Sequence, residues 1–511
     1  MKRSIVLRKV WFPLGAILLF AISILSCKDS NGTAPRKTEQ EKLSYFLALA
    51  DSLRQMANIP GVGIAIISNG KTLYAGGLGL QNIKEQIPVN ENTLFSIGSN
   101  TKAFTGALAA KLVEKGKMNW HIPLRDYIPE LELKEDYITQ HVSLIDALNH
   151  MTGLGRHDDI WKYKEFPRDE ILIKVKALDF AGSFRSSFGY NNIMYVIAGI
   201  AMERASGSSY ERLVQEHLFS PLGMINSYVT QEDFENAPTR AIGYKEDGVT
   251  PETVVYLDHI APAGSISSTP KDISKWIAML MNGGKLGNKK ILNENEYKFM
   301  MTAHDDIGFR EPNQYWFYNA GIGGYLQDGK RNLGHSGSID GQNSFMLLKP
   351  DDGFGIFLMT NKLSDYKDVM AQYAQNIFVD DNYVRNKKAE EKLKELVVFA
   401  QFKDQLIKNS IEEAKTTYKT MNPENLESAM NQLGYQLLRH GDFEKAKFVF
   451  EQNTLDHPKS ANAFDSFGEF YFEIGDFEKA LKHYEKSIEL NQGNTNAKMM
   501  IKKIHRQSKQ Y

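Results

Sequence analysis

The sequence has one cysteine, Cys27, in 511 residues, so it cannot form a disulfide within the chain. It also has almost no net charge, because 61 Lys and Arg residues balance 62 Asp and Glu residues. This balance gives no general attraction for nucleic acid. The twelve histidines show no paired spacing with cysteine or carboxylate that is typical of a metal site, and the chain has no phosphate loop or dinucleotide fingerprint. We therefore expect no metal, no cofactor and no nucleic-acid partner.

The apolar run near the N-terminus is too short to span a membrane. It covers residues 10–25, after a basic start, whereas a spanning helix needs about 20 apolar residues. The pattern predicts a secretion signal over residues 1–27. Its end resembles a bacterial lipobox, which implies that Cys27 is lipidated; a lone buried thiol is the alternative. We expect an exported lipoprotein of the bacterial cell envelope, on its periplasmic or surface face, held to the membrane by the lipid anchor, with residues 28–40 as a flexible tether.

Residues 95–112, FSIGSNTKAFTGALAAKL, place a serine and a lysine three residues apart at the start of a predicted helix. From Lys102 onward apolar residues recur at steps of three and four, as in a helix that buries one face. Ser99 is expected at the helix start, after a strand-like run over residues 93–98, with Lys102 one turn later on the same side. A lysine can accept the serine proton only if its pKa falls from about 10.4 to near 7 or 8. Burial and a helix N-terminus both favour that fall.

Ser-x-x-Lys alone is weak evidence, because it occurs four times, at Ser68, Ser99, Ser268 and Ser364. A capping serine beside a solvated lysine is the ordinary explanation for any single copy. Two further motifs select Ser99. Tyr190-Asn191-Asn192 stands directly before an apolar helical run that stops at Gly207, and His335-Ser336-Gly337-Ser338 lies in a strand-like segment.

In this order, Ser-x-x-Lys, Tyr-x-Asn and His-x-Gly resemble the three active-site motifs of the serine hydrolases related to class C β-lactamases and penicillin-binding proteins. The resemblance covers about residues 43–376 and includes IPGVGIAIISNGKTLYAGGLG, LNHMTGL, LFSPLGM and PAGSISSTPKDISKW. It implies an α+β fold, with an antiparallel sheet flanked by helices beside an all-helical region. The nucleophile would lie in the cleft between them.

The resemblance also implies roles for single residues. Ser99 would attack a carbonyl of a small-molecule or peptide acyl substrate, while Lys102 and Tyr190 take up and return protons. The backbone amides of Ser99 and Ser338 would hold the oxyanion. His335 would line the cleft and hydrogen-bond toward Tyr190, whose pKa an ammonium at Lys102 would lower. The full substrate-binding set is Asn192, His335, Gly337 and Ser338.

His335 departs from the β-lactamases and transpeptidases that this chain resembles, in which this position is usually lysine. A lysine there is a permanent cation suited to the carboxylate of a penicillin or a D-alanine terminus. Histidine, with an ordinary pKa of about 6.5, is mostly neutral at pH 7. The sequence therefore favours an esterase or D-amino-acid peptidase, and the alternative is a β-lactamase or D-alanyl-D-alanine carboxypeptidase.

Patterns outside the motifs also predict an α+β domain, over residues 41–380. A helix is expected over residues 38–57, followed by two strands, 61–68 and 71–80, that form a hairpin at Asn69-Gly70. Later strands at 343–348 and 354–360 suggest an antiparallel sheet covered by helices. Aromatic residues between the first two motifs, Trp161 and Tyr163 among them, are expected in the core more often than in a substrate pocket.

After a helical connector at residues 381–425, the chain contains an internal repeat. Gly441-Asp-Phe-Glu-Lys-Ala446 recurs letter for letter as Gly475-Asp-Phe-Glu-Lys-Ala480, 34 residues later. The pattern resembles tetratricopeptide repeats and predicts an α-helical repeat domain over residues 426–511. Because two repeats are few, helices at 411–419 and 497–505 are expected to complete the stack.

The repeats leave two interpretations open. They could bind a protein or peptide partner, or they could pack against the hydrolase, which we favour slightly because two repeats form little concavity. At the level of the whole chain, the rival to an enzyme is an inert hydrolase fold that serves as a scaffold, although the presence of Lys102 and Tyr190 argues against it.

Overall fold

The computed structural model describes residues 37–252, 257–303, 305–311, 314–380 and 387–507. The chain divides into two compact units, Met1–Thr38 and Glu39–Tyr511. Cys27, the predicted signal and most of the predicted tether lie outside the described residues. Within the part of the chain that the structure describes, no helix has the length and apolar character needed to cross a membrane.

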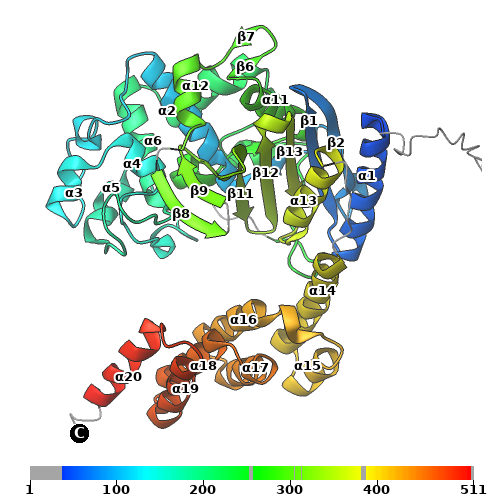
Figure 1. Cartoon of the computed structure of the whole chain (residues 1–511), viewed down its shortest axis with the longest axis vertical. Coiled ribbons are helices and arrows are strands. Elements are labelled where there is room, and N and C mark those ends of the chain that lie inside the picture. The colour runs from blue at the N-terminus through cyan, green and yellow to red at the C-terminus, as the bar shows by residue number, and fades with distance from the viewer. Residues whose placement is uncertain (1–36, 253–256, 304, 312–313, 381–386, 508–511) are drawn as a thin grey trace, which may run out of the picture. The chain divides into compact units, whose positions relative to one another are not determined.

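A nine-stranded antiparallel sheet in the order β3-β2-β1-β13-β12-β11-β10-β9-β8 forms the centre of the region before residue 380 (Figure 1). Its strands are β1 Gly61–Ser68, β2 Lys71–Asn82, β3 Ile87–Pro88, β8 Asp305–Glu311, β9 Gln314–Asn319, β10 Ile322–Gln327, β11 Lys330–Ile339, β12 Gln342–Lys349 and β13 Phe354–Thr360. Two short pairs join β4 Phe95–Ser96 to β5 Ser267–Ser268 and β6 Lys285–Leu286 to β7 Lys289–Lys290.

The predicted hairpin between β1 and β2 is confirmed. Its two turn residues, Asn69 and Gly70, have φ angles of 46° and 74°, the left-handed conformation that a two-residue hairpin turn with this sequence requires. On its other side β1 pairs with β13, so the first and last strands of this region are neighbours in the sheet.

Side chains along each strand point alternately to the two faces of the sheet, and helices cover both faces. Ile64 and Ile66 of β1 pack with α1 Glu39–Met56 and α13 Tyr366–Phe378 in one hydrophobic core. Ala65 and Ile67 pack in a second, larger core on the opposite face. This arrangement confirms the predicted α+β class.

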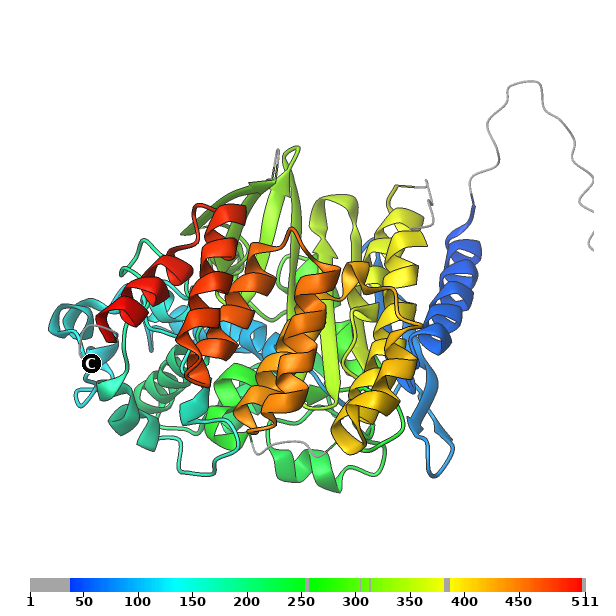
Figure 2. The ribbon, with the colours of Figure 1, turned by 90° about the horizontal axis from the view of Figure 1, so that it is seen from below.

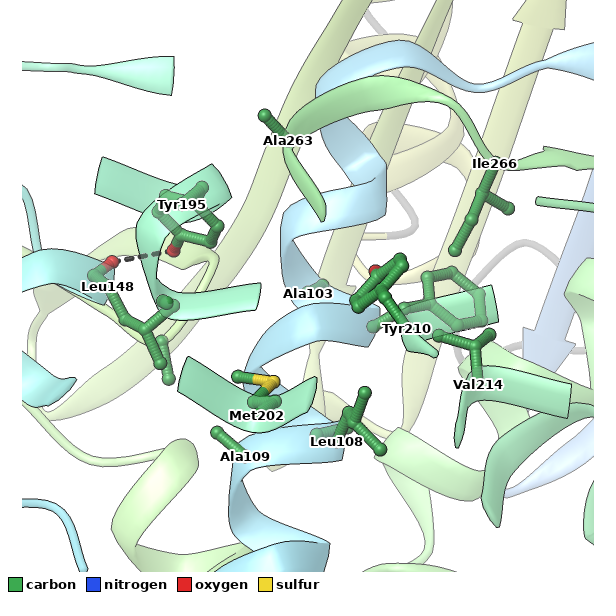
Figure 3. Close-up of a cluster of buried hydrophobic side chains, with 14 of the residues drawn as sticks. Ala103, Leu108, Ala109, Leu148, Tyr195, Met202, Tyr210, Val214, Ala263 and Ile266 are labelled. Atoms are coloured by element: carbon green, nitrogen blue, oxygen red, sulfur yellow. Dashed lines mark hydrogen bonds between the residues drawn. The ribbon is translucent and has the colours of Figure 1, made fainter. Parts of the chain in front are cut away.

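The helices between residues 101 and 300 are α2 Thr101–Glu114, α3 Asp136–His141, α4 Leu144–Leu148, α5 Glu170–Lys174, α6 Asn192–Ser206, α7 Tyr210–Val214, α8 Ser220–Leu222, α9 Gln231–Asn236, α10 Ala261–Gly264, α11 Pro270–Met281 and α12 Glu294–Met300. All of them except α9 contribute residues to the second core. Helix α2 runs through its centre, where Leu108 and Ala109 lie among residues of α6 and α7 such as Met202 and Val214 (Figure 3). The Tyr195 hydroxyl donates to the Leu148 carbonyl at 2.6 Å, which ties α6 to α4.

The C-terminal region is all helical. Its helices are α14 Lys387–Lys408, α15 Ile411–Tyr418, α16 Glu427–Arg439, α17 Phe443–Asp456, α18 Ala461–Glu473, α19 Phe477–Leu490 and α20 Thr495–Gln507. Helices α16 to α20 follow one another side by side (Figure 2). Each copy of the repeated hexapeptide begins a helix in the same way, because the side chain of Asp442 or Asp476 accepts the backbone N–H three residues later. Residues of α15 and α20, including Ala414 and Ala497, lie in the core of this stack.

Candidate active site

Ser99 lies in a single 3₁₀ turn, Gly98–Asn100, that leads directly into α2. The strand expected over residues 93–98 is much shorter, since only Phe95–Ser96 pair as strand β4. Side chains of β12 hold the turn instead. Gln342 accepts the Ser96 amide N–H at 2.8 Å, and the Ser344 hydroxyl donates to the Ile97 carbonyl at 2.7 Å.

Lys102 has no solvent exposure, and its Nζ touches three acceptors. It lies 2.7 Å from Asn192 Oδ1, 2.7 Å from the Ala263 carbonyl oxygen and 3.3 Å from Ser99 Oγ. Burial lowers the pKa of Lys102 well below its ordinary value. A neutral amine has two N–H groups and one lone pair. In that form the two short contacts would use the N–H groups and leave the lone pair facing Ser99.

Tyr190 completes the group. Its ring centroid lies 4.9 Å from Lys102 Nζ, and its side chain hydrogen-bonds Ser99. The expectation that an ammonium would lower the pKa of Tyr190 is wrong. Burial raises this pKa to about 12, although the hydrogen bond with Ser99 and the charge of Arg156 both act to lower it. The reason is that burial disfavours the charge on the lysine as well as on the phenol. Burial therefore favours the neutral form of the amine and of the phenol.

The other copies of Ser-x-x-Lys make no such contact. Ser268 is hydrogen-bonded to Ser227 at 2.8 Å, while Lys271 pairs with Glu91 at 2.9 Å. Ser68 donates to Glu39. The structure brings together an alcohol, an amine and a phenol at Ser99 alone among these pairs, each of which lies in the described part of the chain.

Asn192 is the first residue of α6. The preceding residue, Asn191, caps the helix by accepting the Met194 N–H at 2.9 Å. Asn192 accepts from Lys102 through Oδ1 and donates through Nδ2 to Asp158 at 3.0 Å. The Tyr-x-Asn motif thus places both of its side chains on the same lysine.

His335 is half-buried on β11, but its hydrogen bonds differ from the prediction. Its Nε2 accepts the Tyr318 hydroxyl at 2.9 Å and its Nδ1 donates to the Ser336 carbonyl at 2.6 Å. The predicted hydrogen bond to Tyr190 is therefore wrong, since both ring nitrogens have other partners and the two rings lie 6.1 Å apart. Burial and the nearby Lys102 lower the pKa of His335 to about 3, so the imidazole is neutral at pH 7.

Glycines bring the backbone of β11 against the turn that holds Ser99. A Cβ at Gly337 would lie 2.0 Å from the Ile97 carbonyl oxygen, and one at Gly98 would lie 2.7 Å from the Ser338 amide nitrogen. Neither position has room for a side chain. The Ser338 amide is consequently close to Ser99, as an oxyanion site would require.

Sequence reasoning missed two charged residues at the site. Asp158 accepts from Asn192 and from Trp161 Nε1, the latter at 2.9 Å, and it pairs with Arg156. The guanidinium of Arg156 lies 5.6 Å from the centroid of the Tyr190 ring. Both residues follow LNHMTGL in a loop without a motif, so no signal in the sequence connects them with Lys102.

A cleft of about 270 Å³ opens over Ser99. Trp161 lies in the larger core, as expected, and also lines the cleft, whereas Tyr163, which was expected in the core as well, is 71% exposed. Apolar residues and two oppositely charged pairs form the wall, whose members are Gly98, Ser99, Arg156, Asp158, Trp161, Lys162, Asn192, Leu257, Ile260, Ala263, Gly264, Ser338, Ile339, Asp340 and Leu363. Among the described residues there is no group of three or more metal-binding side chains.

Comparison with known proteins agrees with this geometry. The sequence profile of the family described as Beta-lactamase matches residues 46–378. The chain belongs to the beta-lactamase family. Members of this family are serine hydrolases. A profile described as Tetratricopeptide repeat matches residues 461–494, which span α18 and α19.

Individual relatives are distant. Protein flp of Staphylococcus aureus is 24% identical over 334 residues, 64% of each chain. An unguisins hydrolase of Aspergillus violaceofuscus is 27% identical over 332 residues, 59% of this chain and 58% of the relative. The chain thus spans about three fifths of the length of these curated relatives. In fold it is similar to the octameric penicillin-binding protein homologue from Pyrococcus abyssi, with a TM-score of 0.59 and 22% identity over 71% of this chain and 81% of that one.

Proposed function

We propose that this member of the family is an active serine hydrolase that forms an acyl-enzyme on Ser99. The observation that carries the proposal is the contact between Ser99 Oγ and the buried amine of Lys102, 3.3 Å apart, with Tyr190 hydrogen-bonded to the same serine. A buried lysine whose pKa is lowered by burial is a suitable proton acceptor for a serine nucleophile.

In the proposed reaction, Ser99 Oγ attacks the substrate carbonyl and its proton passes to Lys102 Nζ. The oxyanion accepts hydrogen bonds from the amides of Ser99 and Ser338. Tyr190 is protonated at neutral pH because burial raises its pKa. It donates this proton to the leaving group and takes up a proton from Lys102 in its place. Water then cleaves the acyl-enzyme, with the same groups acting in reverse.

The substrate we favour is an ester or a D-amino-acid amide without an essential carboxylate. The neutral state of His335 supports this choice, because an imidazole engaged by Tyr318 and the Ser336 carbonyl offers no cation. The apolar wall of the cleft suits an apolar acyl group. The similarity to an unguisins hydrolase supports hydrolysis as the type of reaction.

A second candidate is a β-lactamase or D-alanyl-D-alanine carboxypeptidase. Arg156 and Lys162 line the cleft and would offer cations to a substrate carboxylate. Both are paired, Arg156 with Asp158 and Lys162 with Asp340 at 3.6 Å, so a carboxylate would have to compete with these acids. We therefore rank this activity second.

The test is labelling with a fluorophosphonate, followed by turnover of short acyl esters, D-amino-acid amides and nitrocefin. Wild type should label, and Ser99→Ala should neither label nor turn over any substrate while keeping its melting temperature. A wild-type chain that is folded but does not label would favour the inert scaffold. Nitrocefin as the best substrate would reverse the ranking of the two activities.

We also propose that the protein acts at the cell envelope through a lipid on Cys27. Replacing Cys27 with Ser should move the full-length protein from the membrane fraction to the soluble fraction, and continued membrane fractionation would count against lipidation. For the repeats we propose packing against the hydrolase, with binding of a protein or peptide partner as the alternative. Equal activity and melting temperature of the hydrolase after deletion of residues 426–511 would favour the partner.

A further inference from the structure

Asp158 stands at the end of a hydrogen-bond chain that begins at Lys102. The amine of Lys102 donates to Asn192 Oδ1 at 2.7 Å, and Asn192 Nδ2 donates to Asp158 Oδ1 at 3.0 Å. A carboxamide carries its oxygen and its nitrogen on one planar group. A partner on each side therefore fixes both the plane and the orientation of Asn192, and with them the direction from which the amine is held.

The carboxylate of Asp158 is itself held in place. Trp161 Nε1 donates to the same oxygen, Oδ1, at 2.9 Å, and Arg156 pairs with the other oxygen. The side chain of Asp158 is 26% exposed, whereas that of Arg156 is 63% exposed. Solvent consequently screens the positive charge of the pair more than the negative one.

Lys102 is surrounded by titratable groups from several elements, but few of them are charged. Those that act on it or face it are Asp158, Arg156, His150, His335, Tyr190 and Tyr195. Burial lowers the pKa of both histidines and raises the pKa of both tyrosines, so these four are neutral at pH 7. Of this set, Asp158 and Arg156 act on the lysine in opposite directions.

We propose that Asp158 is a positioning residue, which holds the amine of Lys102 in line with Ser99 through Asn192 and whose charge, opposed by Arg156, sets the electrostatic environment of that amine. The inference rests on the proposed function, in which Lys102 accepts the proton of Ser99. The carboxylate of Asp158 raises the pKa of Lys102, and the guanidinium of Arg156 lowers it. Removing either charge should therefore shift the pH at which the neutral amine forms.

The test uses Asp158→Asn in the full chain, with Asp159→Asn as the matched control. The carboxamide introduced by Asp158→Asn keeps an oxygen that can accept from Asn192 and Trp161 but loses the charge, and Asp159 is an exposed neighbour in the same short helix. The rate of fluorophosphonate labelling of Ser99 is measured against pH. The acid limb of this profile is the pH range in which the rate rises as the amine loses its proton. In Asp158→Asn it should move to lower pH by about one unit, the order expected for a partly buried charge. In Asp159→Asn it should stay at the wild-type position.

Arg156→Gln removes the positive charge and should shift the profile in the opposite direction. Its acid limb should move to higher pH, by less than that of Asp158→Asn, and the shift should shrink in 1 M salt because the arginine is exposed. Asp158→Ala removes the acceptor as well as the charge, so its maximal labelling rate should fall at least tenfold. Asp158→Glu should restore part of that rate. A purely structural role for Asp158 would change the melting temperature without moving the acid limb.

A second readout separates this inference from the proposed function. The amine of Lys102 can be titrated by NMR in protein labelled with ¹³C-lysine, with its signal assigned by Lys102→Arg. The same downward shift is expected in Asp158→Asn, whether or not Ser99 reacts. A wild-type chain that fails to label refutes the proposed function, whereas superimposed titrations of Asp158→Asn and Asp159→Asn overturn the role of Asp158. If Asp158→Asn does not fold, an unmoved titration in Arg156→Gln overturns it.

Discussion

Ser344→Ala tests how the turn that carries Ser99 is held. The Ser344 hydroxyl donates to the Ile97 carbonyl at 2.7 Å and accepts from Asn100 Nδ2 at 2.8 Å, and both Ser344 and Asn100 are buried. Asn100 Oδ1 already lacks a hydrogen-bond partner among the described residues. The substitution would therefore leave the whole carboxamide of Asn100 buried and unpaired.

The expected cost follows from these contacts. The lost hydrogen bond to the Ile97 carbonyl contributes about 1 kcal/mol net, and the buried amide of Asn100, left without its partner, costs about 1–3 kcal/mol. Together they predict a loss of about 2–4 kcal/mol in the free energy of unfolding. Ser267→Ala is the matched control, because Ser267 is equally buried but its hydroxyl has no partner among the described residues. Its cost should be below about 1 kcal/mol.

Urea unfolding followed by tryptophan fluorescence measures this difference in the full chain. The five tryptophans are at positions 11, 120, 161, 276 and 316, so the signal reports no residue of the C-terminal helices. Ser344→Ala should also label more slowly with fluorophosphonate in the absence of urea, because the turn positions Ser99, the proposed nucleophile. Equal unfolding free energies for Ser344→Ala and Ser267→Ala would refute the reasoning.

Three further predictions concern β11. Gly337→Ala should lower the free energy of unfolding by about 1–3 kcal/mol and remove most of the activity, since the new methyl would overlap the Ile97 carbonyl. Gly189→Ala is the control in the same urea assay and should keep its stability, because the nearest atom to its new methyl lies 3.7 Å away. His335 has a pKa of about 3 in the folded chain and about 6.5 in the unfolded chain, so the unfolded state binds more protons between these pH values. Stability should therefore fall as the pH drops below about 6.5, by at most about 1.4 kcal/mol per pH unit for this group. His335→Gln should flatten that slope, and an unchanged slope would mean that the histidine is not buried in its neutral form. His335→Lys should raise the rate with nitrocefin relative to esters, while no change would show that the residues lining the cleft set the preference.

The local parts of the fold could be predicted because short segments encode them. Asn69-Gly70 adopts the two positive φ angles that its sequence favours, and Gly207, with φ of 73°, ends α6 where the apolar run stops. The Ser99-Lys102 pair was also predictable, since side chains three residues apart at a helix start lie on the same side. These features need no knowledge of the rest of the chain.

The partner of His335 could not be predicted in the same way. Tyr318 reaches His335 because β10 lies between their strands, with Gly323 opposite both Tyr318 and Gly334. A glycine at this point leaves room for the tyrosine ring, 3.1 Å from where a Cβ would be. That register depends on the pairing of three strands, which the hydrophobic pattern of any one of them does not specify.

The burial of Lys102 connects the fold to the proposed chemistry. In the unfolded chain Lys102 would be an ordinary ammonium and Ser99 an ordinary alcohol. Folding buries the amine behind α6 and α10, where Asn192 and the Ala263 carbonyl satisfy its two N–H groups without supplying a full negative charge. A carboxylate in direct contact would have stabilised the ammonium and removed the base. In the proposed arrangement Asp158 lies one carboxamide away, so that its carboxylate orients the amine while the lone pair stays available to Ser99.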